Sequence, residues 1–288
     1  MIWFCTRVGF FREQILSVPL SGPGRAIHSL PKPLIVSSRA DSLPRISPDG
    51  SWITFQSDRT GVSQIWTARS DGSGLHKLTL PGAQSGSGDI SPDGQQITFD
   101  GMLDGHRNIL TCDRNGNNVH RLTNGPTDTV IPRWSADGHS IYFALCHGAA
   151  SDIWKKDLLT DRTKQMTTEG GSVAEESPDG RTLYFTLRDD ISTPVFAMPS
   201  SGGPARKVLD DIAQRAMSVT REGIYYVSTS AQNELRFHDF KSEYDKTVLS
   251  DSDRKFYFVS VSQNHKLALL GVHGPPPGDL MLIRGLRF

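Results

Sequence analysis

The sequence predicts an all-β fold, a β-propeller built from four-stranded antiparallel blades. Three signals recur along the chain with one period: a tight turn, the strand that follows it, and a further strand roughly a dozen residues later. A fixed period in the low forties is typical of propeller blades that contain about four short strands each.

The first signal is a tight turn of the form Ser-Pro-Asp-Gly, as at 47–50. Proline fixes its own φ, serine and aspartate hydrogen-bond to nearby backbone, and glycine tolerates a positive φ. The hydroxyl residue that opens each turn returns at steps of 44, 44, 42, 43 and 42 residues, at Ser47, Ser91, Ser135, Ser177, Thr220 and Ser262. The turn at 135 has alanine in place of proline, and the last two turns have lost the proline as well, but all of them keep the period.

The second signal is a pair of large apolar residues two positions apart directly after each turn. The pairs are Ile53/Phe55, Ile97/Phe99, Ile141/Phe143, Leu183/Phe185, Ile224/Tyr226 and Leu267/Leu269. Residues two apart share one face of a strand. The residue between them is often apolar as well, for example Tyr142 or Tyr184, which predicts strands that are buried on both faces between neighbouring blades.

The third signal supplies the remaining strands of each blade. Gln64-Ile65-Trp66 and its equivalents predict a third strand, and Asp-Gly or Asn-Gly turns then lead to a short outer strand such as 76–79. The order of one turn followed by three strands repeats over six cycles. This repetition predicts the propeller independently of any single motif.

The chain of 288 residues is predicted to form one domain over 1–288, with incomplete blades at both ends. Residues 1–41 resemble a partial first blade and residues 256–288 a partial last blade. Full repeats are expected around 42–84, 85–128, 129–170, 171–213 and 214–255. We therefore expect six to seven blades, with seven favoured. The start inside a blade favours a fragment of a longer protein, and a signal peptide over 1–20 is the alternative.

The terminal assignments rest on short matches to the same signals. In the first blade, Met1–Phe4 match the strand that follows a turn, 13–16 match the third strand, and 34–36 match an outer strand. In the last blade, 279–283 match a third strand. The first cycle thus lacks an inner strand and the last cycle lacks an outer one.

Composition narrows the class of partner. The chain carries 31 basic and 31 acidic side chains, and this neutral balance does not favour binding to a nucleic-acid backbone. Three cysteines are too few for a disulfide framework, and Cys112 and Cys146 are expected to be free thiols in strands. No apolar run is long enough to span a membrane, and we expect a monomer.

The sequence carries no recognisable catalytic or cofactor motif. The nearest approach to a nucleophile elbow, 170–174, has the wrong last residue, and no P-loop or dinucleotide fingerprint occurs. No His or Cys pair has metal-ligand spacing, and the Asp-Gly turns lack the alternating carboxylates of a calcium loop. We therefore expect no enzyme activity, no cofactor and no metal ion.

The repeat motifs support a resemblance to a known family. The turn Ile46–Gly50, the Ile-x-Phe strand, Ser57-Asp58-Arg59 and 64–66 resemble the WD40-like (PD40) propeller repeats of the TolB type. The resemblance covers nearly the whole chain. Residues 39–44 and 278–283 further resemble the C-terminal propeller of bacterial transcriptional regulators with an N-terminal winged helix. This sequence contains no winged helix, so the resemblance implies no DNA binding.

The resemblance implies a non-catalytic module for ligand sensing or protein docking, as part of a larger bacterial regulator. The alternative is a periplasmic TolB-like envelope protein that docks partners, and a peptidase-associated propeller without its hydrolase domain comes third. Periplasmic or cytoplasmic location depends on the segment upstream of Met1. The loops between each outer strand and the next inner strand are the least regular segments and gather at one mouth of the channel, where recognition usually resides.

A partial ring of charge is predicted around the channel mouth, as a site for a protein or a small polar ligand. Arg45, Asp89, Arg133 and Glu175 each lie two residues before a hydroxyl marker, so equivalent blades hold them at one height. Asp128 and Arg215 are added as candidate neighbours. Two hypotheses remain open: neighbours pair across blades, Arg45 with Asp89 and Arg133 with Glu175, or some of these side chains bind a ligand.

Overall fold

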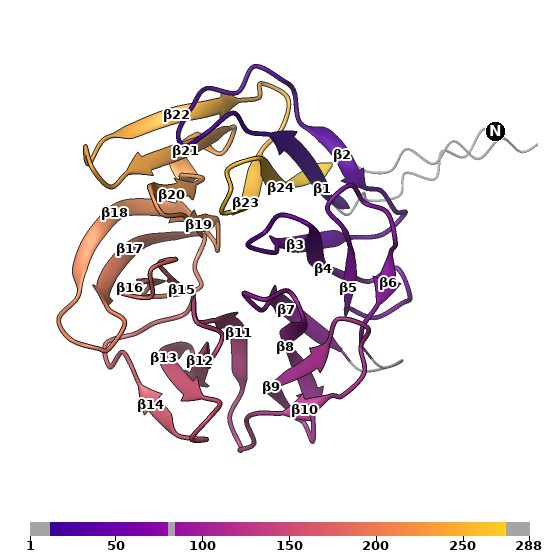
Figure 1. Ribbon diagram of the computed structural model, residues 1–288, viewed down its shortest axis with the longest axis vertical. Helices are drawn as coiled ribbons and strands as arrows, with labels where there is room; N and C mark the ends of the chain where they lie inside the picture. Colours follow the sequence, from indigo (N-terminus) through magenta and orange to yellow (C-terminus); the bar gives the residue numbers. More distant parts are fainter. Residues whose placement is uncertain (1–11, 80–83, 275–288) are drawn as a thin grey trace, which may run out of the picture.

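A computed structural model describes residues 12–79 and 84–274, which form six four-stranded antiparallel sheets around one axis (Figure 1). The first three blades contain, in order, β3 (Asp41–Ile46), β4 (Trp52–Ser57), β5 (Gln64–Arg69) and β6 (His76–Lys77); β7 (Ser85–Ile90), β8 (Gln96–Leu103), β9 (His106–Asp113) and β10 (His120–Arg121); and β11 (Thr129–Trp134), β12 (Ser140–His147), β13 (Ala150–Asp157) and β14 (Thr163–Gln165).

The other three blades complete the ring. They contain β15 (Ala174–Glu176), β16 (Thr182–Thr186), β17 (Ser192–Pro199) and β18 (Arg206–Ala213); β19 (Met217–Val219), β20 (Gly223–Tyr226), β21 (Glu234–Asp239) and β22 (Asp245–Ser250), with a 3-10 turn η1 (Thr229–Ala231); and β23 (Phe256–Val261), β24 (Leu267–Gly274), β1 (Arg12–Pro19) and β2 (Lys32–Ile35). We number these sheets blade 1 to blade 6 in the order given.

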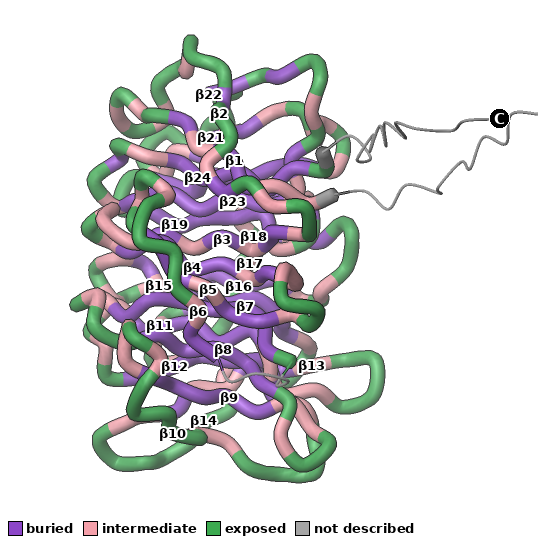
Figure 2. The backbone as a smooth tube through the Cα atoms, turned by 90° about the vertical axis from the view of Figure 1, so that its right-hand side faces the viewer, coloured by how far each residue is buried: buried purple, intermediate pink, exposed green. Residues whose placement is uncertain are grey.

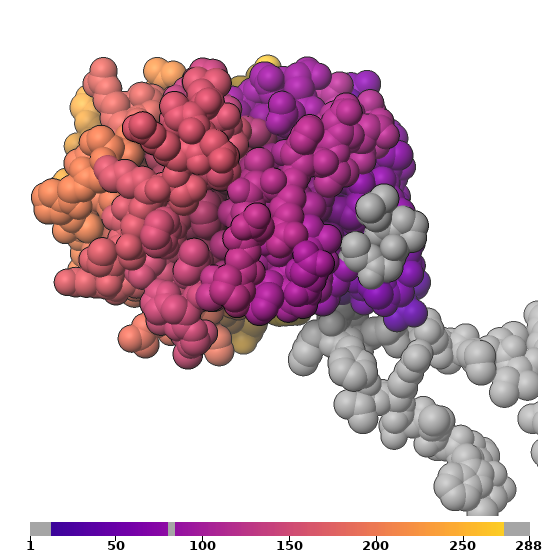
Figure 3. Space-filling view, turned by 90° about the horizontal axis from the view of Figure 1, so that it is seen from below, coloured from indigo at the N-terminus to yellow at the C-terminus, as the bar shows by residue number. Residues whose placement is uncertain are grey.

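The first strand of each blade lies nearest the axis and the fourth lies at the rim (Figure 1). Seen from the rim, successive blades lie side by side in chain order (Figure 3). Buried segments follow the strands, whereas the exposed segments are mostly the connections at the edges of the disc (Figure 2). The inner strands all run from a loop mouth, where the connections from the previous blade arrive, to a turn mouth, where the Ser-Pro-Asp-Gly turns lie.

The predicted turns repeat one set of hydrogen bonds at the turn mouth. In the turn that begins at Ser91, the serine hydroxyl donates to Asp93 Oδ1 at 2.6 Å and accepts from the Gln96 backbone N–H at 2.9 Å. Gly94 has φ +70°, which an L side chain rarely adopts. The same serine-to-aspartate bond occurs at Ser47, Ser135 and Ser177. The turn is therefore specified by its own side chains.

The strand after each turn is buried on both faces, as the sequence predicts. Phe55, Phe99, Phe143 and Phe185 have 4% or less of their surface exposed. Phe99 packs in a cluster that joins blade 2 to Ile65 and Leu78 of blade 1. Tyr142, from the other face, is also fully buried. Packing between blades therefore forms the core.

The expectation of seven blades is wrong, because the two incomplete ends form one blade. β1 pairs with β24 over eight residues, from Arg12 with Gly274 to Pro19 with Leu267. β23 and β24 supply the inner half of blade 6, and β1 and β2 supply the outer half. The complementary gaps at the two ends fill each other, so six blades close the ring. The proposed strands at Met1–Phe4 and 279–283 lie outside the described residues.

The two faces of β1 show how the chain start is held. Ile15 packs with Ile53 and Phe55 of blade 1, whereas its neighbour Leu16 packs with Tyr225 of blade 5. Both side chains are 1% exposed or less. Alternating strand residues thus contact the blades on either side of blade 6.

We expect Phe99→Ala to lower the free energy of unfolding by roughly 3–5 kcal/mol, because it removes a buried ring and leaves a cavity between blades. His120→Ala, on the exposed strand β10, is the matched control and should change it by less than about 0.5 kcal/mol. Chemical denaturation measures both. Equal losses would contradict the assigned blade interface.

We expect Ser91→Ala to destabilise the protein in a pH-dependent way. Donation from the Ser91 hydroxyl lowers the pKa of Asp93 below its ordinary 3.8. A lowered folded-state pKa stabilises the protein above the ordinary value, and this contribution disappears as pH falls through the lowered pKa. The difference between wild type and variant, about 1 kcal/mol near neutrality, should therefore shrink below pH 3.8.

Urea denaturation between neutral pH and about pH 3 measures this difference. Ser201→Ala, at an exposed serine in the turn after β17, is the control and should match wild type throughout. A Ser91→Ala deficit that stays constant through the acid range would contradict the role of the Asp93 carboxylate.

Candidate functional site

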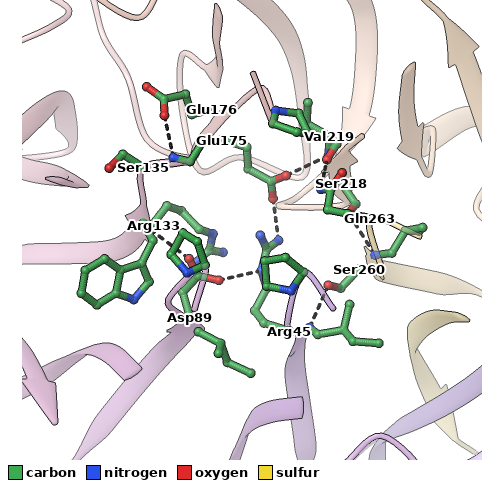
Figure 4. Close-up of a pocket in the computed structure, with 18 residues that line it drawn as sticks. Arg45, Asp89, Arg133, Ser135, Glu175, Glu176, Ser218, Val219, Ser260 and Gln263 are labelled. Atoms are coloured by element: carbon green, nitrogen blue, oxygen red, sulfur yellow. Dashed lines mark hydrogen bonds and ion pairs between the residues drawn. The ribbon is translucent and has the colours of Figure 1, made fainter. Parts of the chain in front are cut away.

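A hollow of about 180 Å³ opens at the turn mouth, and all six blades contribute to its wall (Figure 4). Its polar lining includes Ser135, Glu176 and Gln263 and one residue from each inner strand, two positions before the hydroxyl marker: Arg45, Asp89, Arg133, Glu175, Ser218 and Ser260. We call these six residues the ring positions. Apolar lining comes from the turn prolines Pro48, Pro92 and Pro178 and from strand ends such as Ile46 and Val261. The hollow lies at the opposite mouth from the irregular loops that the sequence favoured for recognition.

The side chains at four ring positions form hydrogen bonds between neighbouring blades. At each, the side chain accepts a hydrogen bond from a backbone N–H of the following blade. The bonds are Trp134 N to Asp89 Oδ2 at 3.0 Å, Val219 N to Glu175 Oε2 at 2.9 Å, Val261 N to Ser218 Oγ at 3.0 Å and Ile46 N to Ser260 Oγ at 3.1 Å. The two arginines cannot accept such a bond, because a guanidinium has no acceptor atom.

Arg45 pairs with two carboxylates from different blades. Its Nη1 lies 2.5 Å from Glu175 Oε1, and its Nε lies 3.4 Å from Asp89 Oδ1. Blades 1 and 4 are opposite in the ring, so Arg45 reaches across the channel to Glu175 (Figures 1 and 4). Burial acts to lower the pKa of Arg45, but Glu175 and then Asp89 outweigh it, and the pKa is raised. Arg45 therefore remains a cation that links three blades.

Arg133 lacks such a partner. Within the described part of the chain, its one hydrogen bond is from Nη1 to the carbonyl oxygen of Pro132 at 2.7 Å, and its buried Nε has no partner. The expected pair with Glu175 does not form, because Glu175 pairs with Arg45. Burial, followed by the positive charge of Arg45, lowers the pKa of Arg133 to about 10. The ring thus holds one guanidinium in excess of its ion pairs.

The other two candidate residues lie at the loop mouth and do not line the hollow. Asp128, just before β11, accepts from the Arg107 backbone N–H at 2.8 Å. Arg215, just before β19, donates from Nε to Asp189 at 2.8 Å and reaches Ser87 of blade 2 at 3.4 Å. The structure therefore brings together four of the six predicted residues and separates Asp128 and Arg215 from them.

The sequence prediction missed Ser218 and Ser260, although the signal was present. Both lie two residues before the markers Thr220 and Ser262, at the same offset as the charged four. Both side chains are uncharged, so a pattern defined by charged residues does not include them. Glu176 was also missed: it accepts from the Ala136 backbone N–H at 2.7 Å and from the Tyr142 hydroxyl at 2.6 Å, and so joins blades 3 and 4 where Arg133 cannot.

Other chemical features are limited in the portion of the chain that the structure covers. No group of three or more His, Cys, Asp or Glu side chains in residues 12–79 and 84–274 is placed to hold a metal ion. Cys112 and Cys146 are free thiols, and burial raises the pKa of Cys112 to about 12. No helix among these residues has the length and apolarity needed to cross a membrane.

Sequence comparison supports the repeat family over part of the chain. Residues 28–130 match the family model of the TolB beta propeller domain, PD40. The uncharacterized protein Atu1656 of Agrobacterium fabrum (strain C58) is 56% identical over 36 residues, and this match spans 12% of each protein.

Solved structures share the fold at low sequence identity. A TolB candidate from Agrobacterium tumefaciens superposes with a TM-score of 0.70 at 16% identity, over 93% of this chain and 100% of that one. TolB from Acinetobacter baumannii gives 0.59 at 18% identity, over 91% of this chain and 63% of its own. A prolyl endopeptidase gives 0.53 at 14% identity, over 77% of this chain and 38% of the enzyme. These matches support the TolB-type fold, whereas the expected link to winged-helix regulators rests on the sequence resemblance alone.

We expect Glu175→Gln to lower the free energy of unfolding by roughly 1.5–3 kcal/mol, because Arg45 loses a buried charged hydrogen bond. The glutamine oxygen still accepts from the Val219 N–H, so the inter-blade bond survives. Asp210→Asn is the control: its pair with Lys207 is exposed and should contribute less than about 1 kcal/mol.

Urea denaturation at low and high salt measures both variants. The Glu175 effect should persist at high salt, because a buried pair is screened much less than an exposed one. A loss that vanishes with salt, or one no larger than that of Asp210→Asn, would contradict the buried pairing across the channel.

Proposed function

We propose that this chain is a non-catalytic, TolB-like propeller module that docks another protein at the turn mouth. The observation that carries the proposal is the hollow itself, whose wall combines residues from all six blades. Side chains from separate blades converge on one point only because the ring is closed. Recognition sites of this kind are typically built on a rigid scaffold.

The size of the hollow favours a protruding group over a whole small molecule. Pockets that enclose drug-sized ligands are commonly about 300–1,000 Å³, whereas this hollow measures about 180 Å³. It has room for one side chain or a chain end. The surrounding turns, with prolines at Pro48, Pro92 and Pro178, offer a rigid apolar rim for the rest of a partner surface.

Such a module fits a TolB-like setting better than a regulator or a peptidase. The repeat-family match and the TolB structures support a TolB-like envelope protein more than the propeller of a winged-helix regulator. The shared fold with a prolyl endopeptidase covers 38% of that enzyme and supports no hydrolytic role for this chain. We therefore propose docking in a TolB-like setting and no chemistry by these residues.

The test is a variant that fills the hollow. Ala136 lines it at the turn position where three other blades carry proline, and its side chain makes no bond there. We expect Ala136→Trp to block docking while leaving the fold intact. Thr160→Trp adds the same bulk to an exposed hairpin turn at the rim and serves as the matched control.

Immobilised wild type and both variants are exposed to extract of the source cells, and retained proteins are quantified by mass spectrometry. We expect a partner that wild type and Thr160→Trp retain and Ala136→Trp loses. An identical set on all three proteins would contradict docking at the turn mouth. Turnover of a chromogenic peptide by purified wild type would contradict the non-catalytic proposal.

A further inference from the structure

Arg133 is a buried cation at the hollow with no carboxylate of its own. It is 4% exposed and lines the hollow (Figure 4). In residues 12–79 and 84–274 it donates one hydrogen bond, to the Pro132 carbonyl oxygen, and its buried Nε donates none. A guanidinium has five N–H donors, so most of its donor capacity is unused.

The nearby carboxylates are already committed. Asp89 receives Arg45 on one oxygen and the Trp134 N–H on the other. Glu175 likewise receives Arg45 on one oxygen and the Val219 N–H on the other. Turning either carboxylate towards Arg133 would break a bond between blades. Among the described residues, no carboxylate oxygen lies within ion-pair distance of Arg133.

Within the described part of the chain, Arg133 forms no bond between blades. It makes none of the inter-blade bonds of the ring positions, and Glu176 joins blades 3 and 4 in its place. Burying a charge without a partner is strongly unfavourable. An anion from outside would remove that penalty, because arginine matches a carboxylate with two parallel hydrogen bonds.

We propose that Arg133 binds a carboxylate that enters the hollow from another molecule. The inference rests on the proposed docking function and specifies the chemistry that the hollow recognises. Arg45 and Arg133 balance Asp89 and Glu175, so the ring positions sum to zero. Glu176 also lines the hollow and pairs with Lys155 at 3.8 Å, so a single negative charge is tolerated better than two. This favours a carboxylate over a phosphate dianion.

The carboxylate has two potential sources, a free small acid and an acidic side chain of a docked protein. The volume of about 180 Å³ fits either one. Three probes separate them: acetate, the capped tripeptide acetyl-Gly-Glu-Gly-amide, and its neutral analogue acetyl-Gly-Gln-Gly-amide. Each is titrated at constant ionic strength, followed by calorimetry and by tryptophan fluorescence, to which Trp134 in the wall contributes.

We expect the glutamyl peptide to bind wild type and the glutaminyl peptide to bind at least about tenfold more weakly. Arg133→Gln should lose the preference, and Arg133→Lys should recover part of it, because lysine keeps the charge without the planar fork. Arg181→Gln, at an exposed arginine next to a turn, is the matched control and should behave as wild type. Acetate binding without a peptide preference would support the free acid as the source.

A second measurement tests whether Arg133 is instead structural. Without added anion, Arg133→Met should melt at the same temperature as wild type or higher, because burial and the charge of Arg45 outweigh the attraction of Asp89 and Glu175 for this guanidinium. A melting temperature lowered by several degrees would overturn the proposal. So would the absence of Arg133-dependent binding by both acetate and the glutamyl peptide. Loss of docking in Ala136→Trp would then still support the proposed function, so the two failures are distinguishable.

Discussion

The pairing of β1 with β24 is the interaction on which the rest of the structure depends. Eight backbone pairs join strands from opposite ends of the described chain and complete blade 6. Without them, β24 and the rim strands β1 and β2 would present open edges, which invite association with other chains. The same pairing holds blades 1 and 5 against blade 6 through Ile15 and Leu16. The channel and its two mouths exist because the pairing of β1 with β24 closes the ring.

Local features of the fold were predictable, because the repeat contains them whole. The Ser47 and Ser91 turns carry their own hydrogen-bonding side chains, and the burial of Phe55 and Phe99 follows from strand periodicity. The blade count was not predictable in this way. A chain end that lacks an inner strand and another that lacks an outer one are equally consistent with two partial blades or one whole blade. The choice depends on whether β1 meets β24, which is a property of the closed ring and not of either segment.

The candidate site was likewise predictable in its local pattern but not in its contacts across the ring. The period placed Arg45, Asp89, Arg133 and Glu175 at one height, and all four line the hollow. Spacing along the chain predicts the height of each residue in the channel but not the width of the channel. It therefore does not reveal that Arg45 pairs with Glu175 across the channel, which leaves Arg133 without a carboxylate partner. It also placed Asp128 and Arg215 with the ring, although both precede their inner strands and lie at the other mouth. The direction of the inner strands decides the mouth, because each strand begins at the loop mouth and ends at the turn mouth.

The geometry of blade 6 also determines how the molecule responds to force. Arg12 begins β1 and pairs with Gly274, which ends β24, so the two attachment points lie at the same end of one antiparallel ladder. Tension applied through them would load the hydrogen-bonded pairs one after another, as in opening a zip, instead of shearing all eight at once. The ring is thus weak in one mechanical direction. A pull along the chain would open it at blade 6 while the other five blades remain folded.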